Sequence, residues 1–135
     1  MSGASVQAAV LAALKSDVGV QEIFGTPARI IDDETDTPMF PYAQLERHEV
    51  NDKGASGVAG AEHRLTIAVL SRHDGLAAAK EALGALKRVV ESGPVTVAGG
   101  YVVMQQVVYA DTMRRADRRA FRGVLRIRMI VEEVI

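Results

Sequence analysis

The sequence predicts an α+β fold: an antiparallel four-stranded sheet with two helices packed on one face, in the order αββαββ, and one long flexible hairpin loop. Two observations predict this fold. Two segments carry apolar residues at the three-to-four-residue spacing of an amphipathic helix, and four others have the alternation or the β-branched composition of strands. Each predicted helix precedes a pair of predicted strands, which favours an antiparallel sheet with both helices on the same side.

The first predicted helix covers Val6–Lys15 and ends at Lys15 or Asp17. Ser5 stands before it and is a favourable N-cap residue. The apolar arc of this helix is wide and rich in alanine, which suits close packing on a sheet. The second predicted helix begins after Asp74 as its N-cap and ends at Gly93-Pro94, a glycine followed by a residue that cannot continue the helix.

The four predicted strands are Tyr42–Val50, Arg64–Ser71, Tyr101–Ala110 and Val124–Val134. Apolar and polar residues alternate most clearly in the second and the fourth, as expected for a sheet with one buried face. Between the first two strands lies Asn51–Gly60, which has three glycines and no large apolar side chain. We expect this segment to be the mobile tip of a long β-hairpin, because it has little to bury.

Composition limits the classes of function. The 135 residues are predicted to form one domain, residues 1–135. The net charge of -1 gives no overall attraction to nucleic acid or to an anionic membrane, and the absence of cysteine removes disulfides, thiolate nucleophiles and Cys-based zinc sites. No signal-peptide pattern is present, and no apolar run approaches the ~20 residues that span a bilayer. We therefore expect no membrane partner.

Candidate catalytic residues are few. Ser71, His73 and Asp74 are the residue types of a nucleophile, base and orienting acid, but residues so close in sequence rarely reach that geometry, and Asp74 is already expected to cap a helix. The sequence has neither a phosphate-binding loop nor a nucleophile elbow. We predict that the chain is not an enzyme, with no catalytic residues and no cofactor.

The histidines suggest one metal hypothesis. In a hairpin symmetric about its glycine-rich tip, His48 and His63 lie opposite each other, with Glu49 and Glu62 alongside. Two imidazoles and two carboxylates could bind a divalent transition metal. The two glutamates would point to the opposite face, however, and metal sites need converging ligands. We therefore favour exposed polar strand residues and predict no metal site.

The charges are more informative. Seven of the twelve arginines lie in a basic stretch, Arg114–Arg128, whose local charge balance is +6. An acidic cluster carries a local charge of -4 and consists of Asp32, Asp33, Glu34 and Asp36. Three interpretations remain open: solvated surfaces, a basic surface near DNA, or an acidic loop of one subunit that meets the basic segment of the next in a head-to-tail ring.

The order of the signals resembles the tail-terminator, or tail-completion, proteins of long-tailed bacteriophages and of the related gene transfer agents. The resemblance covers most of the chain and is strongest from Val10 to Val90. Its marks are structural residues: Leu11, Leu14, Asp17, Val20, Gly25, Arg29-Ile30, Pro41-Tyr42, the apolar strand Leu65–Leu70 and the Leu/Ala-rich second helix. The chain departs from the family pattern in Thr26-Pro27-Ala28, which lengthens the link before Arg29, and in the unusually basic Arg114–Arg122.

This resemblance implies a structural virion protein that forms a homo-hexameric ring. The ring caps the tail tube at its end nearest the head, stops tube polymerisation and docks to the head-tail connector protein, while DNA passes through its hole. The implied partners are further copies of the chain, the tail tube protein and the connector, and the implied location is the head-tail joint of a phage-like particle assembled in the bacterial cytoplasm. The candidate contact residues are Asp32, Asp33, Glu34, Asp36, Asn51, Asp52, Lys53, Arg114, Arg115, Arg118, Arg119 and Arg122.

The alternative function is a small cytoplasmic nucleic-acid-binding module that uses the basic stretch. The nearly neutral net charge and the shortage of aromatic stacking residues count against it. A small hydrolase is a third possibility, supported only by the spacing of Ser71, His73 and Asp74.

Overall fold

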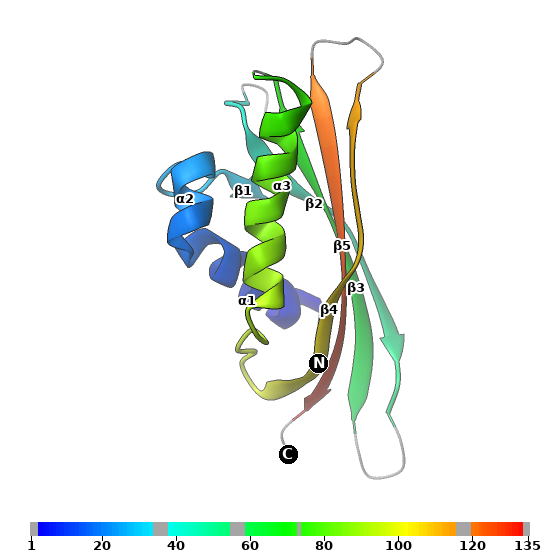
Figure 1. The fold of residues 1–135 in the computed structure, drawn as a ribbon. Helices are drawn as coiled ribbons and strands as arrows, with labels where there is room; N and C mark the ends of the chain where they lie inside the picture. The colour runs from blue at the N-terminus through cyan, green and yellow to red at the C-terminus, as the bar shows by residue number, and fades with distance from the viewer. Residues whose placement is uncertain (1–2, 34–37, 55–58, 73, 116–119, 134–135) are drawn as a thin grey trace.

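The computed structural model describes residues 3–33, 38–54, 59–72, 74–115 and 120–133. Within these residues the chain forms three helices and five strands (Figure 1). In chain order they are α1 (Gly3–Ser16), α2 (Val18–Phe24), β1 (Ile30–Ile31), β2 (Tyr42–Asp52), β3 (Gly60–Ser71), α3 (Gly75–Glu91), β4 (Gly100–Arg114) and β5 (Phe121–Glu133). The predicted α+β class is confirmed, whereas the predicted numbers of helices and strands are wrong.

The five strands form a mixed sheet in the order β1-β2-β3-β5-β4. All neighbours are antiparallel except β1, which pairs in parallel with β2 through Ile30↔Ala43 and Ile31↔Gln44. The prediction of four antiparallel strands missed β1 because two residues are too few to show a strand period. The four longer strands were placed correctly, although each extends beyond at least one of its predicted ends.

The first predicted helix corresponds to α1, and the prediction missed α2, which follows directly after Asp17. This residue has an extended backbone, and its side-chain Oδ2 accepts a hydrogen bond from the Val20 amide at 3.0 Å. Asp17 is therefore the N-cap of α2 rather than the end of a longer helix. Ser5 does not cap α1, which already begins at Gly3.

Helix α3 matches its prediction closely but begins differently. Asp74 occupies the N-cap position, yet its backbone is left-handed, with φ of 65°, and its side chain makes no capping hydrogen bond. The expected capping role of Asp74 is therefore wrong. At the other end the helix stops at Glu91, and Gly93 has φ of 145°, a conformation that favours glycine.

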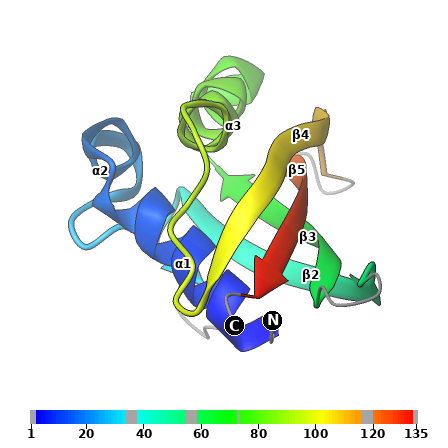
Figure 2. The same cartoon turned by 90° about the horizontal axis from the view of Figure 1, so that it is seen from below.

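All three helices cover one face of the sheet, and the core lies between the two layers (Figure 2). Helix α3 packs over β4 and β5, while α1 contacts β1. A bulge between Leu45 and Arg47 shifts the register of β2 against β3. The alternation of core-facing and outward-facing side chains along β2 therefore shifts by one residue at this point. As a result Ala43 and Leu45 before the bulge, and His48 after it, all face the helices. We call the uncovered side of the sheet the open face.

Several residues that carry the family resemblance come together at the start of the sheet. Gly25 has φ of 93° and ends α2, after which the Arg29 amide donates to the Phe24 carbonyl at 3.0 Å. The Arg29 side chain donates from Nε to the Pro41 carbonyl at 3.0 Å, and the Ala43 amide donates to the Arg29 carbonyl. These bonds hold β1 beside β2, so Gly25, Arg29 and Pro41 work as one structural unit.

No helix among the described residues is long and apolar enough to cross a bilayer.

Candidate functional site

The sheet is elongated, and its two hairpins lie at opposite ends (Figure 1). Strands β3 and β5 pair from Gly60↔Glu132 at one end to Ser71↔Phe121 at the other. The β2–β3 hairpin therefore joins its two strands at one end of the sheet, and the β4–β5 hairpin joins its two strands at the other end. This arrangement gives the molecule two separate ends.

The predicted contact residues of the first hairpin lie at one of these ends. Asn51 and Asp52 are the last residues of β2 rather than part of a loop, and Gly60 already belongs to β3. The Lys53 amide donates to the Gly60 carbonyl at 3.0 Å, and the Gly54 amide donates to Asp52 Oδ1 at 2.8 Å. The expectation of a mobile tip falls mainly on residues 55–58, which lie outside the described residues.

The acidic cluster lies next to the β1 edge of the sheet. Asp32 and Asp33 follow β1 directly, and both are exposed. Asp32 Oδ2 accepts a hydrogen bond from Gln7 Nε2 at 2.7 Å, and the Asp33 carbonyl accepts one from Gln44 Nε2 at 3.2 Å. The other two members of the cluster, Glu34 and Asp36, lie outside the described residues.

The basic stretch lies at the opposite edge, in β4, β5 and their connection. Arg114 ends β4 with its guanidinium 5.2 Å from the Phe121 ring, and the exposed Arg115 donates its amide to the Ala120 carbonyl at 2.9 Å. Arg118 and Arg119 lie outside the described residues. Among the described residues, Arg114 and Arg115 at the end of the edge strand β4 are therefore separated by three strands from Asp32 and Asp33, which follow β1.

The rest of the basic stretch is partly neutralised on the open face. Arg122 forms a two-oxygen ion pair with Glu46, the shorter contact being 2.5 Å. Arg128 Nε donates to Glu62 at 2.5 Å, and Arg64 adds a longer contact at 3.3 Å. These hydrogen bonds, that of Arg128 above all, lower the pKa of Glu62 against the opposing effect of desolvation. The local charge of +6 thus overstates the free positive charge of this segment.

The open face has two further polar contacts and a hollow. Tyr101 donates a hydrogen bond to Glu132, which raises the pKa of the tyrosine, and the Arg126 guanidinium lies 4.7 Å from the centre of the Tyr109 ring. A hollow of about 460 Å³ lies among the charged side chains of β2, β3 and β5. This surface is polar and internally paired, unlike the apolar pockets that bind small molecules.

His48 and His63, the histidines of the metal hypothesis, do contact each other, but they are not directly opposite as that hypothesis expected. His48 pairs with Leu65 and His63 with Val50, so the histidines are diagonal neighbours on the helix-facing side. His48 Nε2 lies 2.8 Å from His63 Nδ1. His63 is fully buried, which contradicts the expectation of exposed strand residues.

This histidine pair does not complete a metal site. Glu62 lies on the open face, as the alternation predicted, and the described residues contain no group of three His, Cys, Asp or Glu side chains able to hold a metal ion. Burial, and then the neighbouring His48, lower the pKa of His63 to about 4. The Nε2 atom of His63 is buried without a hydrogen-bond partner among the described residues. The pair is therefore a neutral buried contact at neutral pH.

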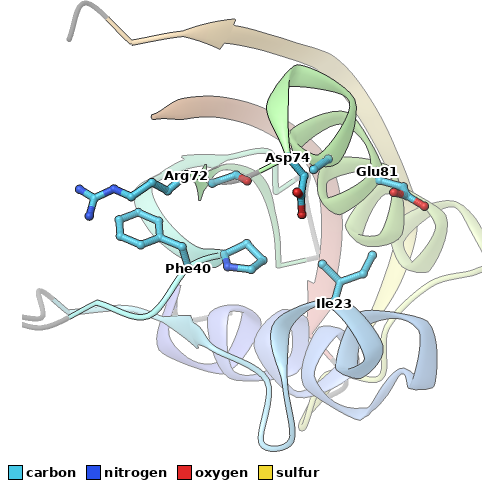
Figure 3. A pocket seen from close by; sticks show the side chains of 8 residues that line it. Ile23, Phe40, Arg72, Asp74 and Glu81 are labelled. Carbon is cyan, nitrogen blue, oxygen red and sulfur yellow. The ribbon is translucent and has the colours of Figure 1, made fainter. Parts of the chain in front are cut away.

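A smaller hollow of about 250 Å³ lies where α2, α3 and the ends of β2 and β3 meet. Figure 3 shows Ile23, Phe40, Arg72, Asp74 and Glu81 around it, with the Arg72 guanidinium 4.5 Å from the centre of the Phe40 ring. Its lining carries charges of both signs, because Arg72 lies beside Asp74 and Glu81.

This hollow also tests part of the hydrolase hypothesis. Ser71 lines the hollow together with Asp74, but Ser71 is buried, with 4% of its surface exposed. His73 lies outside the described residues. The described residues thus show no nucleophile paired with a base.

The most exposed apolar residues were not predicted as candidates. Five of the eight exposed large apolar residues among the described ones lie in the edge strand β4: Tyr101, Val103, Val108, Tyr109 and Met113. The sequence does contain a signal for two of them. The doublets Val102-Val103 and Val107-Val108 break the alternation of the strand, and β4 has register shifts at both places.

Comparisons with known proteins agree with this architecture. A search of curated proteins finds no match. Among solved structures, the chain is similar to a chain of the structure titled "Virion of native gene transfer agent (GTA) particle", with 27% sequence identity, 96% of each chain covered and a TM-score of 0.85. Residues 8–132 match the protein family described as tail completion protein gp17. The resemblance seen in the sequence is therefore confirmed, and the chain belongs to the tail completion protein gp17 family.

Proposed function

We propose that this chain is a structural protein of a virion tail and one subunit of a homo-hexameric ring. The ring caps the tail tube at the head-proximal end, ends tube polymerisation and docks to the head-tail connector protein. DNA passes through its central hole. The ring assembles in the bacterial cytoplasm and stays at the head-tail joint of the particle.

The observation that carries this proposal is the pair of hairpins at opposite ends of one sheet (Figure 1). A protein that ends a tube needs two unlike faces, one that fits the last tube ring and one that cannot accept another tube subunit. The β2–β3 end carries Asp52 and Lys53, whereas the β4–β5 end carries Arg114 and Arg115. Family membership and the match to a virion structure support the same role.

Ring formation and tube capping can be tested together. The purified chain is first imaged by negative-stain electron microscopy over a range of concentrations. It is then added to tail tube protein during polymerisation, and tube lengths are measured. We expect sixfold rings with a central hole, and tubes that shorten as more of the chain is added. Tubes whose length distribution does not change would refute the capping function.

A variant and a matched control address the first hairpin. Lys53→Glu reverses an exposed charge at the β2–β3 end, and Lys80→Glu makes the same change on the exposed side of α3. If this hairpin contacts the tube or the connector, only Lys53→Glu should weaken capping or connector binding.

The nucleic-acid alternative predicts a different result. A module that uses the basic stretch should bind duplex DNA in a salt-dependent way and should lose that binding when Arg118 and Arg119 are changed to Glu. In the ring, the same changes should chiefly disturb assembly. Salt-sensitive duplex binding without rings and without tube capping would favour the alternative.

A further inference from the structure

Strand β4 is an edge strand with an unusual amount of exposed apolar surface. It pairs only with β5, and its outer edge has no strand beside it among the described residues. Val103 and Val108 are 53% and 44% exposed, and Met113 near its end is 46% exposed. A long edge strand with exposed apolar residues promotes association with another chain, and natural proteins usually protect such edges with charges or proline.

The two bulges of β4 indicate what kind of association this edge allows. The register shifts lie between Val102 and Met104 and between Val107 and Tyr109, so Val103 and Val108 are the extra residues. A bulge interrupts the regular row of backbone hydrogen-bond groups and redirects side chains. The edge is therefore poorly suited to simple strand addition and better suited to packing through its valines.

The opposite edge of the sheet has complementary properties. Strand β1 is only two residues long and leads into Asp32 and Asp33. Met39, just before β2, is 69% exposed, and Ile31 of β1 itself is partly exposed. This edge therefore combines exposed apolar residues with negative charge, whereas the β4 edge combines them with Arg114 and Arg115. Within one molecule the two edges are separated by the whole sheet, so they can meet only between molecules.

We propose that the β4 edge of one subunit packs against the β1 edge of a second copy of this chain, in a head-to-tail contact. The valines of β4 lie against the apolar residues beside β1, and Arg114 and Arg115 approach Asp32 and Asp33 of the neighbour. This inference rests on the proposed ring and names its subunit contact. Because the two edges differ, every row of copies has one β1 edge and one β4 edge without a neighbour. These two end edges can meet only when the row closes into a ring.

A symmetric contact between two β4 edges is the main competing arrangement. It would bury the same valines, but it would stop at a dimer and would bring no basic side chain of the second copy to Asp32. Charge complementarity across the two different edges favours the head-to-tail arrangement.

Thiol cross-linking distinguishes these arrangements cleanly, because the chain has no cysteine. Four variants are compared with a short thiol-to-thiol cross-linker: Met113→Cys next to Arg114, Asp32→Cys, the double variant of these two, and Val108→Cys near the middle of β4. We expect the double variant to give a ladder of covalent species beyond the dimer, while each single variant stays monomeric on denaturing gels. Dimers from Val108→Cys alone would overturn the head-to-tail contact in favour of the symmetric one.

Failure of this contact can be told apart from failure of the ring. Rings in the microscope without cross-links in the double variant would overturn the edge contact and leave the ring intact. No cross-links and no rings at any concentration would also overturn the edge contact, and the tube-capping assay then decides the proposed function separately.

Charge reversal supplies a second readout. Changing Arg114 and Arg115 to Glu, or Asp32 and Asp33 to Lys, should each raise the concentration needed for assembly by about tenfold, a typical effect for a few charged contacts at an interface. The two changes combined in one chain should restore assembly. Combined variants that assemble no better than either alone would count against the pairing of these edges.

Discussion

Lowering the pH should destabilise this protein before its carboxylates titrate, because His63 is buried in a neutral form. Its pKa in the folded chain is lowered from 6.5 to about 4. Between these two values the unfolded chain binds more protons than the folded one, so the stability present above pH 6.5 is lost progressively as the pH falls. The loss from His63 alone between about pH 7.5 and about pH 5 is about 2 kcal/mol.

The geometry of the histidine pair explains this cost. At neutral pH one ring nitrogen donates and the other accepts across the 2.8 Å between His48 Nε2 and His63 Nδ1. When both rings are protonated, both nitrogens carry hydrogen and the contact becomes repulsive. In the protonated ring of His63 the buried Nε2 carries a hydrogen that has no acceptor among the described residues. Burial lowers the pKa of His48 as well, which adds to the effect in the same direction.

Urea unfolding followed by far-ultraviolet circular dichroism at pH 7.5 and pH 5 measures the loss. His63→Leu removes the buried titrating group and should flatten the pH dependence, whatever it does to stability itself. His73→Ala is the control and should keep the full dependence. The reasoning is refuted if the free energy of unfolding is equal at both pH values, or if His63→Leu retains the wild-type dependence.

Three further changes test local structure by the same unfolding measurement at neutral pH. Asp17→Ala removes the side-chain cap of α2 and should lower the free energy of unfolding by about 1 kcal/mol. Asp74→Gly, at a left-handed position without a capping bond, should change it by less than about 0.5 kcal/mol. Equal losses would contradict the assignment of the cap to Asp17. Gly25→Ala should cost about 1–3 kcal/mol, because φ there is 93° and a Cβ would lie 2.6 Å from the Arg29 guanidinium; an unchanged midpoint would show that this turn relaxes. Gln105→Ala should lower the free energy of unfolding by about 2–3 kcal/mol, because the Gln105 side chain makes three hydrogen bonds to backbone groups around the turn after α3. Gln106 is exposed, so Gln106→Ala should leave the free energy of unfolding nearly unchanged.

Periodic segments were predictable from the sequence, and short or interrupted ones were not. The seventeen residues of α3 and the alternation in β3 and β5 repeat often enough to be recognised. Strand β1 has two residues, and its place in the sheet depends on hydrogen bonds from Arg29 and Ala43 that no local pattern records. Helix α2 was missed because its seven residues make only about two turns, too few to show a clear apolar period, and the N-cap role of Asp17 depends on its bond to the Val20 amide.

The candidate surfaces were predictable in charge but not in arrangement. The acidic cluster and the basic stretch were evident in the sequence, yet their positions at opposite edges follow from the strand order. The pairing of Arg122 with Glu46 joins residues 76 positions apart, and only the register of β2, β3 and β5 brings them together. The predicted register of the histidine pair was wrong because the hairpin closes after Asp52↔Ala61, which places His48 opposite Leu65 and His63 opposite Val50.

The run of β3 and β5 from one hairpin to the other also has a mechanical consequence. These two antiparallel strands form the centre of the sheet and stay paired over twelve successive positions along the long direction of the subunit. A pull applied between the two ends would load their hydrogen bonds in shear, all at once, rather than opening them one after another. In the proposed ring, each subunit would therefore resist a pull between its two docking ends through this pair of strands.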